Sequence, residues 1–178
     1  MRQIEGMKIH TLVVLTASTL AFSTPVLVQA DPIPNPLIDY PGFQKIVDTS
    51  NRERESRRLT EDAFLSKMKE KDVVVLDARS ATMYQLRHIK GATSLPFTDF
   101  SATSLARVIP SKETEVLIYC NNNFLNDPVS MFSKTAAASL NLSTYTSLKA
   151  YGYDNIFELG PLLDVNKTTI PFAGSEVK

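Results

Sequence analysis

The sequence is poor in the residues that build metal and cofactor sites. It has one cysteine, two histidines and no tryptophan among 178 residues. A single cysteine excludes an internal disulfide, a cysteine-rich zinc site and an iron–sulfur cluster with four cysteine ligands from this chain. We therefore expect no metal and no cofactor. The remaining composition, 43% hydrophobic and 21% charged residues, is typical of an ordinary globular domain.

The sequence also lacks an excess of either charge. Lys and Arg together number 19, as do Asp and Glu, so the formal net charge is zero. Nucleic acids and anionic membrane surfaces are held largely by an excess of positive charge. We therefore expect no nucleic-acid partner, and the charge balance does not indicate any other class of partner.

The first thirty residues have the pattern of a secretory signal peptide. Arg2 and Lys8 precede an uncharged, mainly apolar stretch at residues 11–30, and small residues near its end favour cleavage before Asp31. An uncleaved membrane anchor is the alternative, because the stretch is just long enough to span a bilayer. Its serines, threonines and proline make it a poor span. We expect residues 1–30 to be a signal peptide and the protein to be exported, with no membrane span after cleavage. It would be periplasmic in a Gram-negative bacterium and secreted otherwise.

Residues 31–57 are predicted to form a proline-rich arm followed by a helix. Four prolines between residues 31 and 41 favour extended backbone. Apolar residues at helical spacing then lead into the charged run 52–58, where Glu53 and Arg57 stand four residues apart in the order that stabilises a helix. We interpret this run as the solvent-exposed face of a helix, with a docking patch as the alternative.

Three short apolar runs, rich in β-branched residues, predict strands buried on both faces. A helix is expected to begin at Thr60, whose side-chain oxygen can cap free amides, and another to span about residues 143–151 and stop at Gly152. Strands that alternate with helices predict an α/β fold with a mainly parallel sheet. The runs are residues 73–76, 116–119 and 155–159.

Ligands in such sheets gather at the carboxyl ends of the strands, and Asp77 and Cys120 each directly follow one of the runs. The segments around them resemble a known family. Residues 73–80 and 88–96, with Asp77-Ala78-Arg79 and His88-Ile89-Lys90-Gly91-Ala92, look like the two amino-terminal signatures of rhodanese-like domains. Cys120 stands where that family carries its active-site cysteine. The resemblance covers about residues 58–165, and we expect the domain to occupy residues 58–178.

The resemblance implies a rhodanese-like α/β fold, with a mainly parallel five-stranded sheet flanked by helices. It also implies a sulfurtransferase that carries sulfane sulfur as a persulfide on Cys120, taken from a small sulfur donor and passed to a thiol acceptor. Backbone amides that curl around a sulfur at a strand-to-loop junction can stabilise its charge. We therefore expect the residues after the cysteine to bind substrate. These are Asn121, Asn122, Asn123, Phe124, Leu125 and Asn126.

Three further residues of the motifs are expected to have structural roles. Charged residues just past a buried strand need partners, so Asp77 and Arg79 are predicted to form an internal charge pair that orders the loops. His88 is predicted to make a structural hydrogen bond near a turn. Phosphatase chemistry is excluded because no arginine closes the loop after Cys120. A serine hydrolase is excluded because the sequence has no Gly-x-Ser-x-Gly motif.

Two alternatives stay open for the segment after the cysteine. It carries no cation before Lys134 and is longer than the family's catalytic loops, so residues 121–141 form an expanded loop. That loop could bind a protein or small ligand in a catalytically silent module. Alternatively, the lone thiol could exchange disulfides with a second protein. The sequence does not predict an oligomeric state.

Overall fold

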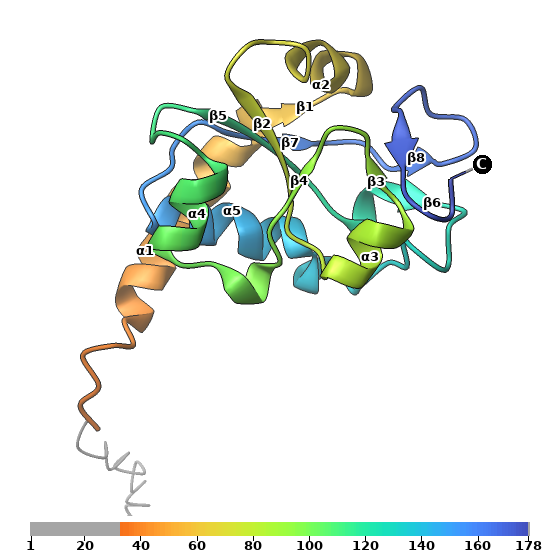
Figure 1. The fold of residues 1–178 in the computed structure, drawn as a ribbon. Helices are drawn as coiled ribbons and strands as arrows, with labels where there is room; N and C mark the ends of the chain where they lie inside the picture. The colour runs from red at the N-terminus through yellow and green to blue at the C-terminus, as the bar shows by residue number, and fades with distance from the viewer. Residues whose placement is uncertain (1–32, 178) are drawn as a thin grey trace, which may run out of the picture. The chain divides into compact units, whose positions relative to one another are not determined.

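A parallel five-stranded sheet forms the centre of the fold (Figure 1). The computed structural model describes residues 33–177, so the predicted signal peptide lies outside the described residues. Every pairing in this sheet is parallel, as expected from the continuous apolar runs. The strands lie in the order β1 (Arg58–Leu59), β7 (Ile156–Leu159), β5 (Glu115–Tyr119), β2 (Val73–Asp77) and β4 (Thr93–Ser94).

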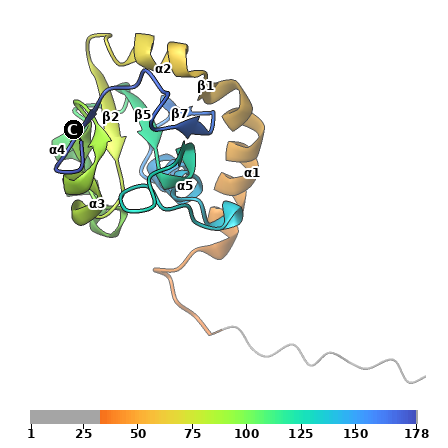
Figure 2. The same ribbon diagram turned by 90° about the vertical axis from the view of Figure 1, so that its right-hand side faces the viewer.

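Helices cover both faces of this sheet (Figure 1). On one face, α2 (Glu61–Lys67) buries Phe64 in a cluster with side chains of β2 and β5. On the other, α4 (Ala102–Val108) and α5 (Leu140–Ala150) bury Leu105 and Tyr145 against the same strands. α1 (Tyr40–Arg57) runs alongside α5 and β7, as Figure 2 shows. The predicted α/β architecture, a five-stranded parallel sheet flanked by helices, is therefore confirmed.

Shorter elements surround the carboxyl end of the sheet. Two small ladders join segments that are distant in the sequence, one antiparallel and one parallel. They pair β3 (His88–Ile89) with β9 (Phe172–Ala173), and β6 (Phe124–Leu125) with β8 (Leu163–Asp164). The remaining elements are α3 (Ala81–Leu86) and the 3₁₀ turns η1 (Phe97–Asp99), η2 (Asn121–Asn123) and η3 (Ala136–Ala138).

Local sequence signals set the helix ends. The Thr60 hydroxyl accepts a hydrogen bond from the backbone N–H of Ala63 at 3.3 Å, which makes Thr60 the predicted cap of α2. Gly152 has a φ of +79°, and the backbone N–H of Tyr153 donates to the Leu148 carbonyl at 3.0 Å. This is the Schellman arrangement, so Gly152 ends α5 as predicted. Residues 33–39 form neither helix nor strand.

Two expectations at the helices are wrong. α5 begins at Leu140 and not near residue 143, because the 3₁₀ turn η3 leads the chain directly into it. Glu53 does not pair with Arg57 along α1. Its carboxylate lies 2.9 Å from Lys149 of α5, and the Arg57 guanidinium lies 5.0 Å from the centre of the Phe157 ring. Tertiary partners therefore take precedence over the helix's own i,i+4 pair.

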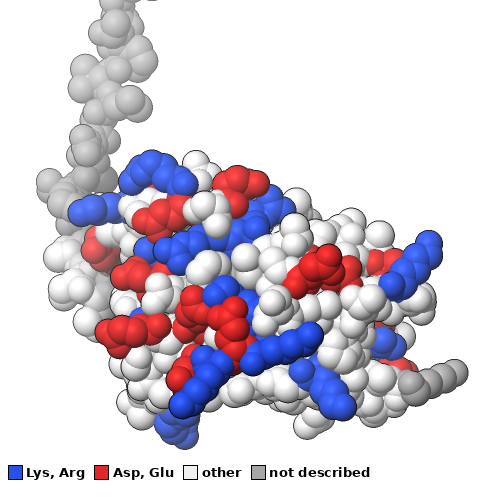
Figure 3. All heavy atoms as spheres, turned by 90° about the horizontal axis from the view of Figure 1, so that it is seen from above, with Lys and Arg blue, Asp and Glu red and all other residues white. Residues whose placement is uncertain are grey.

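Charges of both signs are mixed on one face of the molecule. On the face drawn in Figure 3, Lys and Arg side chains lie among Asp and Glu side chains. Among the helices within residues 33–177, none is both long and apolar enough to cross a membrane.

Candidate functional site

Cys120 directly follows β5, which lies at the centre of the sheet between β2 and β7. The residue is only 1% exposed. Its backbone N–H donates to Oδ1 of Asn123 at 2.9 Å, and its carbonyl accepts from the Asn123 N–H at 3.1 Å. The Cys120 Sγ lies 3.4 Å from the hydroxyl oxygen of Ser139. The cysteine is thus fixed at the start of the turn η2, with a hydroxyl as its closest side-chain partner.

Cys120 lines a pocket of about 390 Å³. The wall is mainly polar and charged, and we call this cavity the Cys120 pocket. It combines η2 and η3 with residues from α1, β1, α5 and the end of β7. The other lining residues are Arg54, Arg58, Asn122, Asn123, Ala136, Ser139, Asn141, Leu142, Glu158, Leu159 and Gly160.

A buried ion pair stands on the same side of the sheet as the cysteine. Ile118 of β5 is in register with Glu158 of β7. Because side chains alternate along a strand, Cys120, two residues after Ile118, shares that face with Glu158. The Glu158 side chain is 1% exposed, and its Oε1 lies 2.6 Å from Nη2 of Arg54. Arg54 therefore compensates a carboxylate that has almost no access to water.

A second arginine completes the charge of the pocket. Nη2 of Arg58 donates to the Gly160 carbonyl at 3.0 Å, and its Nη1 lies 3.2 Å from Oε2 of Glu55. Two guanidinium groups and one carboxylate thus line the cavity, with a formal net charge of +1. Both arginines lie in the charged run 52–58, whose pattern predicted a solvent-exposed helix face and no site residue. In the sequence, the alternative interpretation of this run as a docking patch is the only indication that Arg54 and Arg58 contribute to a site.

The three asparagines after Cys120 hold the following segment in place. Asn121 donates to the Phe132 carbonyl at 2.9 Å, Asn122 to the Lys134 carbonyl at 2.7 Å, and Asn123 to the Leu159 carbonyl at 2.7 Å. Of the three, Asn122 and Asn123 line the Cys120 pocket. Asn121 lines a neighbouring pocket of about 430 Å³ together with Phe132 and Lys134.

The structure does not bring Phe124, Leu125 or Asn126 to the Cys120 pocket. Phe124 is 1% exposed in the core, and its ring centroid lies 6.2 Å from that of Tyr119. Leu125 continues β6 away from the cysteine, and Asn126 then turns the chain with a φ of +65°. None of these three predicted substrate residues therefore lines the Cys120 pocket.

The predicted expanded loop, residues 121–141, is largely organised by the domain itself. It contains η2, β6 and η3, and it buries Met131 in the core at 2% exposure. Three of its apolar side chains are nevertheless exposed: Leu125 by 45%, Val129 by 56% and Phe132 by 47%. The segment thus combines a small buried core with an apolar outer side.

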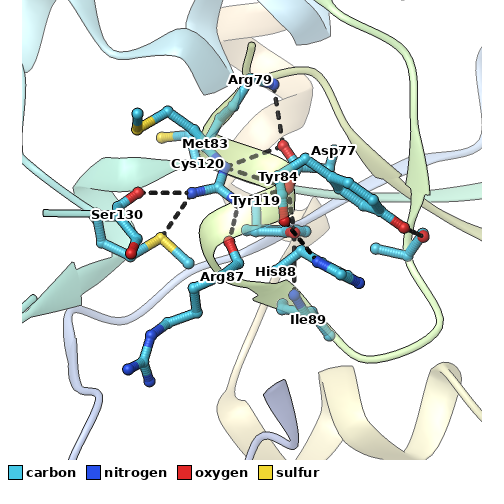
Figure 4. Close-up of polar contacts among 12 residues, drawn as sticks. Asp77, Arg79, Met83, Tyr84, Arg87, His88, Ile89, Tyr119, Cys120 and Ser130 are labelled. Atoms are coloured by element: carbon cyan, nitrogen blue, oxygen red, sulfur yellow. Dashed lines mark hydrogen bonds and ion pairs between the residues drawn. The ribbon is translucent and has the colours of Figure 1, made fainter. Parts of the chain in front are cut away.

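Asp77 and Arg79 form a buried ion pair (Figure 4). Nη2 of Arg79 lies 2.6 Å from Oδ2 of Asp77, and the two side chains are 1% and 0% exposed. The same guanidinium donates to the Ser130 carbonyl at 2.9 Å and to the Arg87 carbonyl at 2.6 Å. Burial lowers the pKa of Arg79, but hydrogen bonding and charge from Asp77 outweigh it and raise the pKa above its ordinary value. The pair joins the end of β2 to two loops.

Tyr119 extends this network on the sheet face opposite the Cys120 pocket. Its hydroxyl donates to Oδ2 of Asp77 and accepts from the Ile89 N–H, at 3.1 Å in the second case (Figure 4). Burial and the negative charge of Asp77 raise the pKa of Tyr119 well above its ordinary value. Since Tyr119 and Cys120 are adjacent in β5 and its extension, they point to opposite faces. The network therefore stabilises the carboxyl end of β5 from the sheet face opposite Cys120.

His88 lies at the edge of this network (Figure 4). Its Nδ1 is 2.7 Å from the Tyr84 carbonyl, and the two rings are stacked with centroids 3.8 Å apart. It is absent from the lining of the Cys120 pocket. Within residues 33–177, no group of three or more His, Cys, Asp or Glu side chains is placed to hold a metal ion.

Comparison with known proteins identifies this architecture. A family model described as "Rhodanese-like domain" matches residues 60–159. Among solved structures, the BH2092 protein from Bacillus halodurans is similar with a TM-score of 0.50 and 18% identity, over 75% of this chain and 88% of that one. The rhodanese-like domain of the Alr3790 protein from Anabaena sp. is similar with a TM-score of 0.47 and 20% identity, over 67% and 80%. No curated protein matches the chain.

Proposed function

The chain belongs to the rhodanese-like domain family, and from that premise we propose that it is a sulfurtransferase whose Cys120 carries sulfane sulfur as a persulfide. The observation that carries the proposal is the place of Cys120 at the carboxyl end of the central strand, on a polar pocket with positive charge. A thiol is useful as a nucleophile only where its thiolate is stabilised and a reactant can reach it.

The surroundings of Cys120 suit both steps of sulfur transfer. In the first, the Cys120 thiolate attacks the outer sulfur of a donor such as thiosulfate. An Sγ–S bond forms, the donor's S–S bond breaks, and sulfite leaves with the electron pair. In the second, an acceptor thiolate attacks the outer sulfur of the persulfide and releases the Cys120 thiolate. The Ser139 hydroxyl, 3.4 Å from Sγ, can donate to the Cys120 thiolate that starts the first step and is released in the second.

Intact mass after incubation with thiosulfate tests this function. We expect the protein to gain the mass of one sulfur atom, cyanide to remove it as thiocyanate, and Cys120→Ser to gain nothing. Asn122→Ala is a matched variant that keeps the thiol and alters the pocket wall, and it should load more slowly. A Cys120→Ser protein that still transfers sulfur would show that the mechanism is wrong.

Exposed apolar side chains on residues 121–141 favour a second candidate, a catalytically silent binding module. Leu125, Val129 and Phe132 are each about half exposed, while Cys120 is almost fully buried. This candidate predicts that Cys120 gains no sulfur and resists alkylation in the folded protein. It also predicts that Phe132→Ser weakens partner binding with no loss of folding. A trapped heterodimer on non-reducing gels would instead point to disulfide exchange by Cys120.

We also propose that the protein is exported, on the pattern of residues 1–30. Expression of the full chain in a Gram-negative host, followed by fractionation and amino-terminal sequencing, tests this proposal. A periplasmic product that begins at Asp31 is expected. A full-length product in the membrane fraction would favour the uncleaved anchor.

A further inference from the structure

We propose that the junction of α1 and β1 is part of the reactive site: Arg58, the first residue of β1, positions reactants that carry negative charge for attack by Cys120, and Arg54 of α1 with Glu158 forms its fixed support. The inference rests on the proposed function in one respect, that Cys120 is the group that reacts in this pocket. It adds a selectivity for negatively charged reactants and assigns it to Arg58, which lies outside the matched residues 60–159.

The end of α1 is held tightly against the domain. Arg54 pairs with Glu158 of β7 at 2.6 Å, and Glu53 pairs with Lys149 of α5 at 2.9 Å. Arg57 covers the Phe157 ring at 5.0 Å. Partners on two elements therefore fix both the rotation and the position of the helix, so Arg58, the next residue, enters the Cys120 pocket in a defined place.

The two arginines of the pocket have different tasks. The Arg54 charge is matched by Glu158, whose side chain is 1% exposed and could not remain ionised at low cost without it. Arg58 stands in register with Glu158 across β1 and β7, but the ion pair of that carboxylate is with Arg54. Its carboxylate neighbour, Glu55, is 82% exposed, where an ion pair is strongly screened by water. The uncompensated positive charge of the pocket is therefore that of Arg58.

The Gly160 carbonyl orients this charge. It accepts from Nη2 of Arg58 at 3.0 Å, which fixes one side of the guanidinium against the chain just after β7. The side chain is still 40% exposed, so its other N–H groups can meet a reactant. A fixed, partly hydrated cation at the pocket wall favours an approaching anion over a neutral molecule of the same shape.

Iodoacetate and iodoacetamide test this selectivity, because they are nearly the same size and differ in charge. Both alkylate the same thiolate, so the ratio of their rates with Cys120 cancels any change in the fraction of thiol that is ionised. At low ionic strength, the Coulomb energy across a pocket of this size in a largely aqueous medium corresponds to a rate ratio change of about two- to sixfold. We expect Arg58→Ala to lower the iodoacetate-to-iodoacetamide ratio by that factor.

Four comparisons separate positioning from a general structural effect. Arg58→Lys should restore most of the ratio, and Glu158→Gln should raise it, because it removes the only carboxylate that lines the pocket. Arg52→Ala changes an exposed arginine of α1 that does not line the pocket, and it should leave the ratio unchanged. Added salt at 0.5 M or so should reduce the difference between wild type and Arg58→Ala.

The outcomes distinguish this inference from the proposed function. If the ratio shifts as expected but thiosulfate loads no sulfur, the anion selectivity stands and the sulfurtransferase proposal falls. If sulfur loads normally but Arg58→Ala and Glu158→Gln leave the ratio unchanged, Arg58 has no positioning role and the inference is wrong. If neither reagent alkylates Cys120 in the folded protein, the pocket does not admit reactants to the sulfur, and the inference is also wrong.

Discussion

Replacement of Arg79 by methionine should destabilise the protein more than any surface change. Arg79→Met keeps much of the aliphatic volume but removes the partner of Asp77, which is 0% exposed. It also deprives the Ser130 and Arg87 carbonyls of the N–H groups that lie 2.9 Å and 2.6 Å away. The loss of one partner from a buried ion pair typically costs about 3–5 kcal/mol, because the other charge remains buried without compensation.

Urea unfolding at pH 7, followed by circular dichroism, measures this cost. With a slope of about 1–3 kcal/mol per molar urea, a loss of 3 kcal/mol lowers the midpoint by about 1 M or more. The double variant Asp77→Asn/Arg79→Met removes both charges and should recover about 2 kcal/mol or more of the loss. This second variant keeps the test informative if Arg79→Met alone does not fold.

A small effect would refute the reasoning. If Arg79→Met loses less than about 1 kcal/mol, the pair behaves like an exposed ion pair, which contributes about 0–1 kcal/mol. Equal losses in the single and double variants would likewise show that the stranded Asp77 charge is not the cause. Arg52→Ala provides the baseline for an exposed arginine.

Three further results are expected. Phe124→Ala should lower the free energy of unfolding by about 3–5 kcal/mol, measured by urea unfolding, because the ring is fully buried; a loss below 1 kcal/mol would place Phe124 outside the core. Asn123→Ala should cost about 1–3 kcal/mol in the same assay, since it leaves the Cys120 N–H and the Leu159 carbonyl unpaired, and no loss would contradict the hydrogen bonds. The hydrogen bond from Thr168 lowers the pKa of Glu61 below its ordinary 4.5; burial opposes this shift, and hydrogen bonds from Thr169 add to it. The ionised Glu61 therefore stabilises the folded protein above pH 4.5, and this contribution is lost as the pH falls through the folded-state pKa. Glu61→Gln should therefore be less stable than wild type at pH 7 and approach it at acid pH in thermal melts; a constant difference across pH would contradict this.

The sequence predicted the central strands because their patterns are continuous. Residues 73–76 and 116–119 are apolar runs rich in β-branched residues, residues 155–159 are mainly apolar with Glu158 among them, and such runs are stable in a sheet covered on both faces. The outer strands β1 and β4 contain two residues each, which is too short for any periodic pattern. They exist because neighbouring strands offer free backbone groups at the edges of the sheet.

In the segment after the cysteine, local sequence patterns do not predict which side chains are buried. Phe124 and Phe132 are both phenylalanines in a region that the sequence indicates as a loop, yet one is 1% and the other 47% exposed. The difference comes from β6, which pairs with β8 almost forty residues later and turns Phe124 toward Tyr119. Neither residue has a local signal for this outcome, because the pairing partner lies elsewhere in the chain.

The sequence by itself determined the three central strands and the helices that begin after Thr60 and end at Gly152, the position of Cys120 at the end of a buried strand, and the pairing of Asp77 with Arg79. Each depends on residues that are close in the chain or on a pattern that one segment carries. Only the tertiary structure decided what surrounds the sulfur. Arg54, Arg58 and Glu158 meet Cys120 because α1 packs against α5 and β7, and contacts between such distant segments are fixed by packing of whole elements.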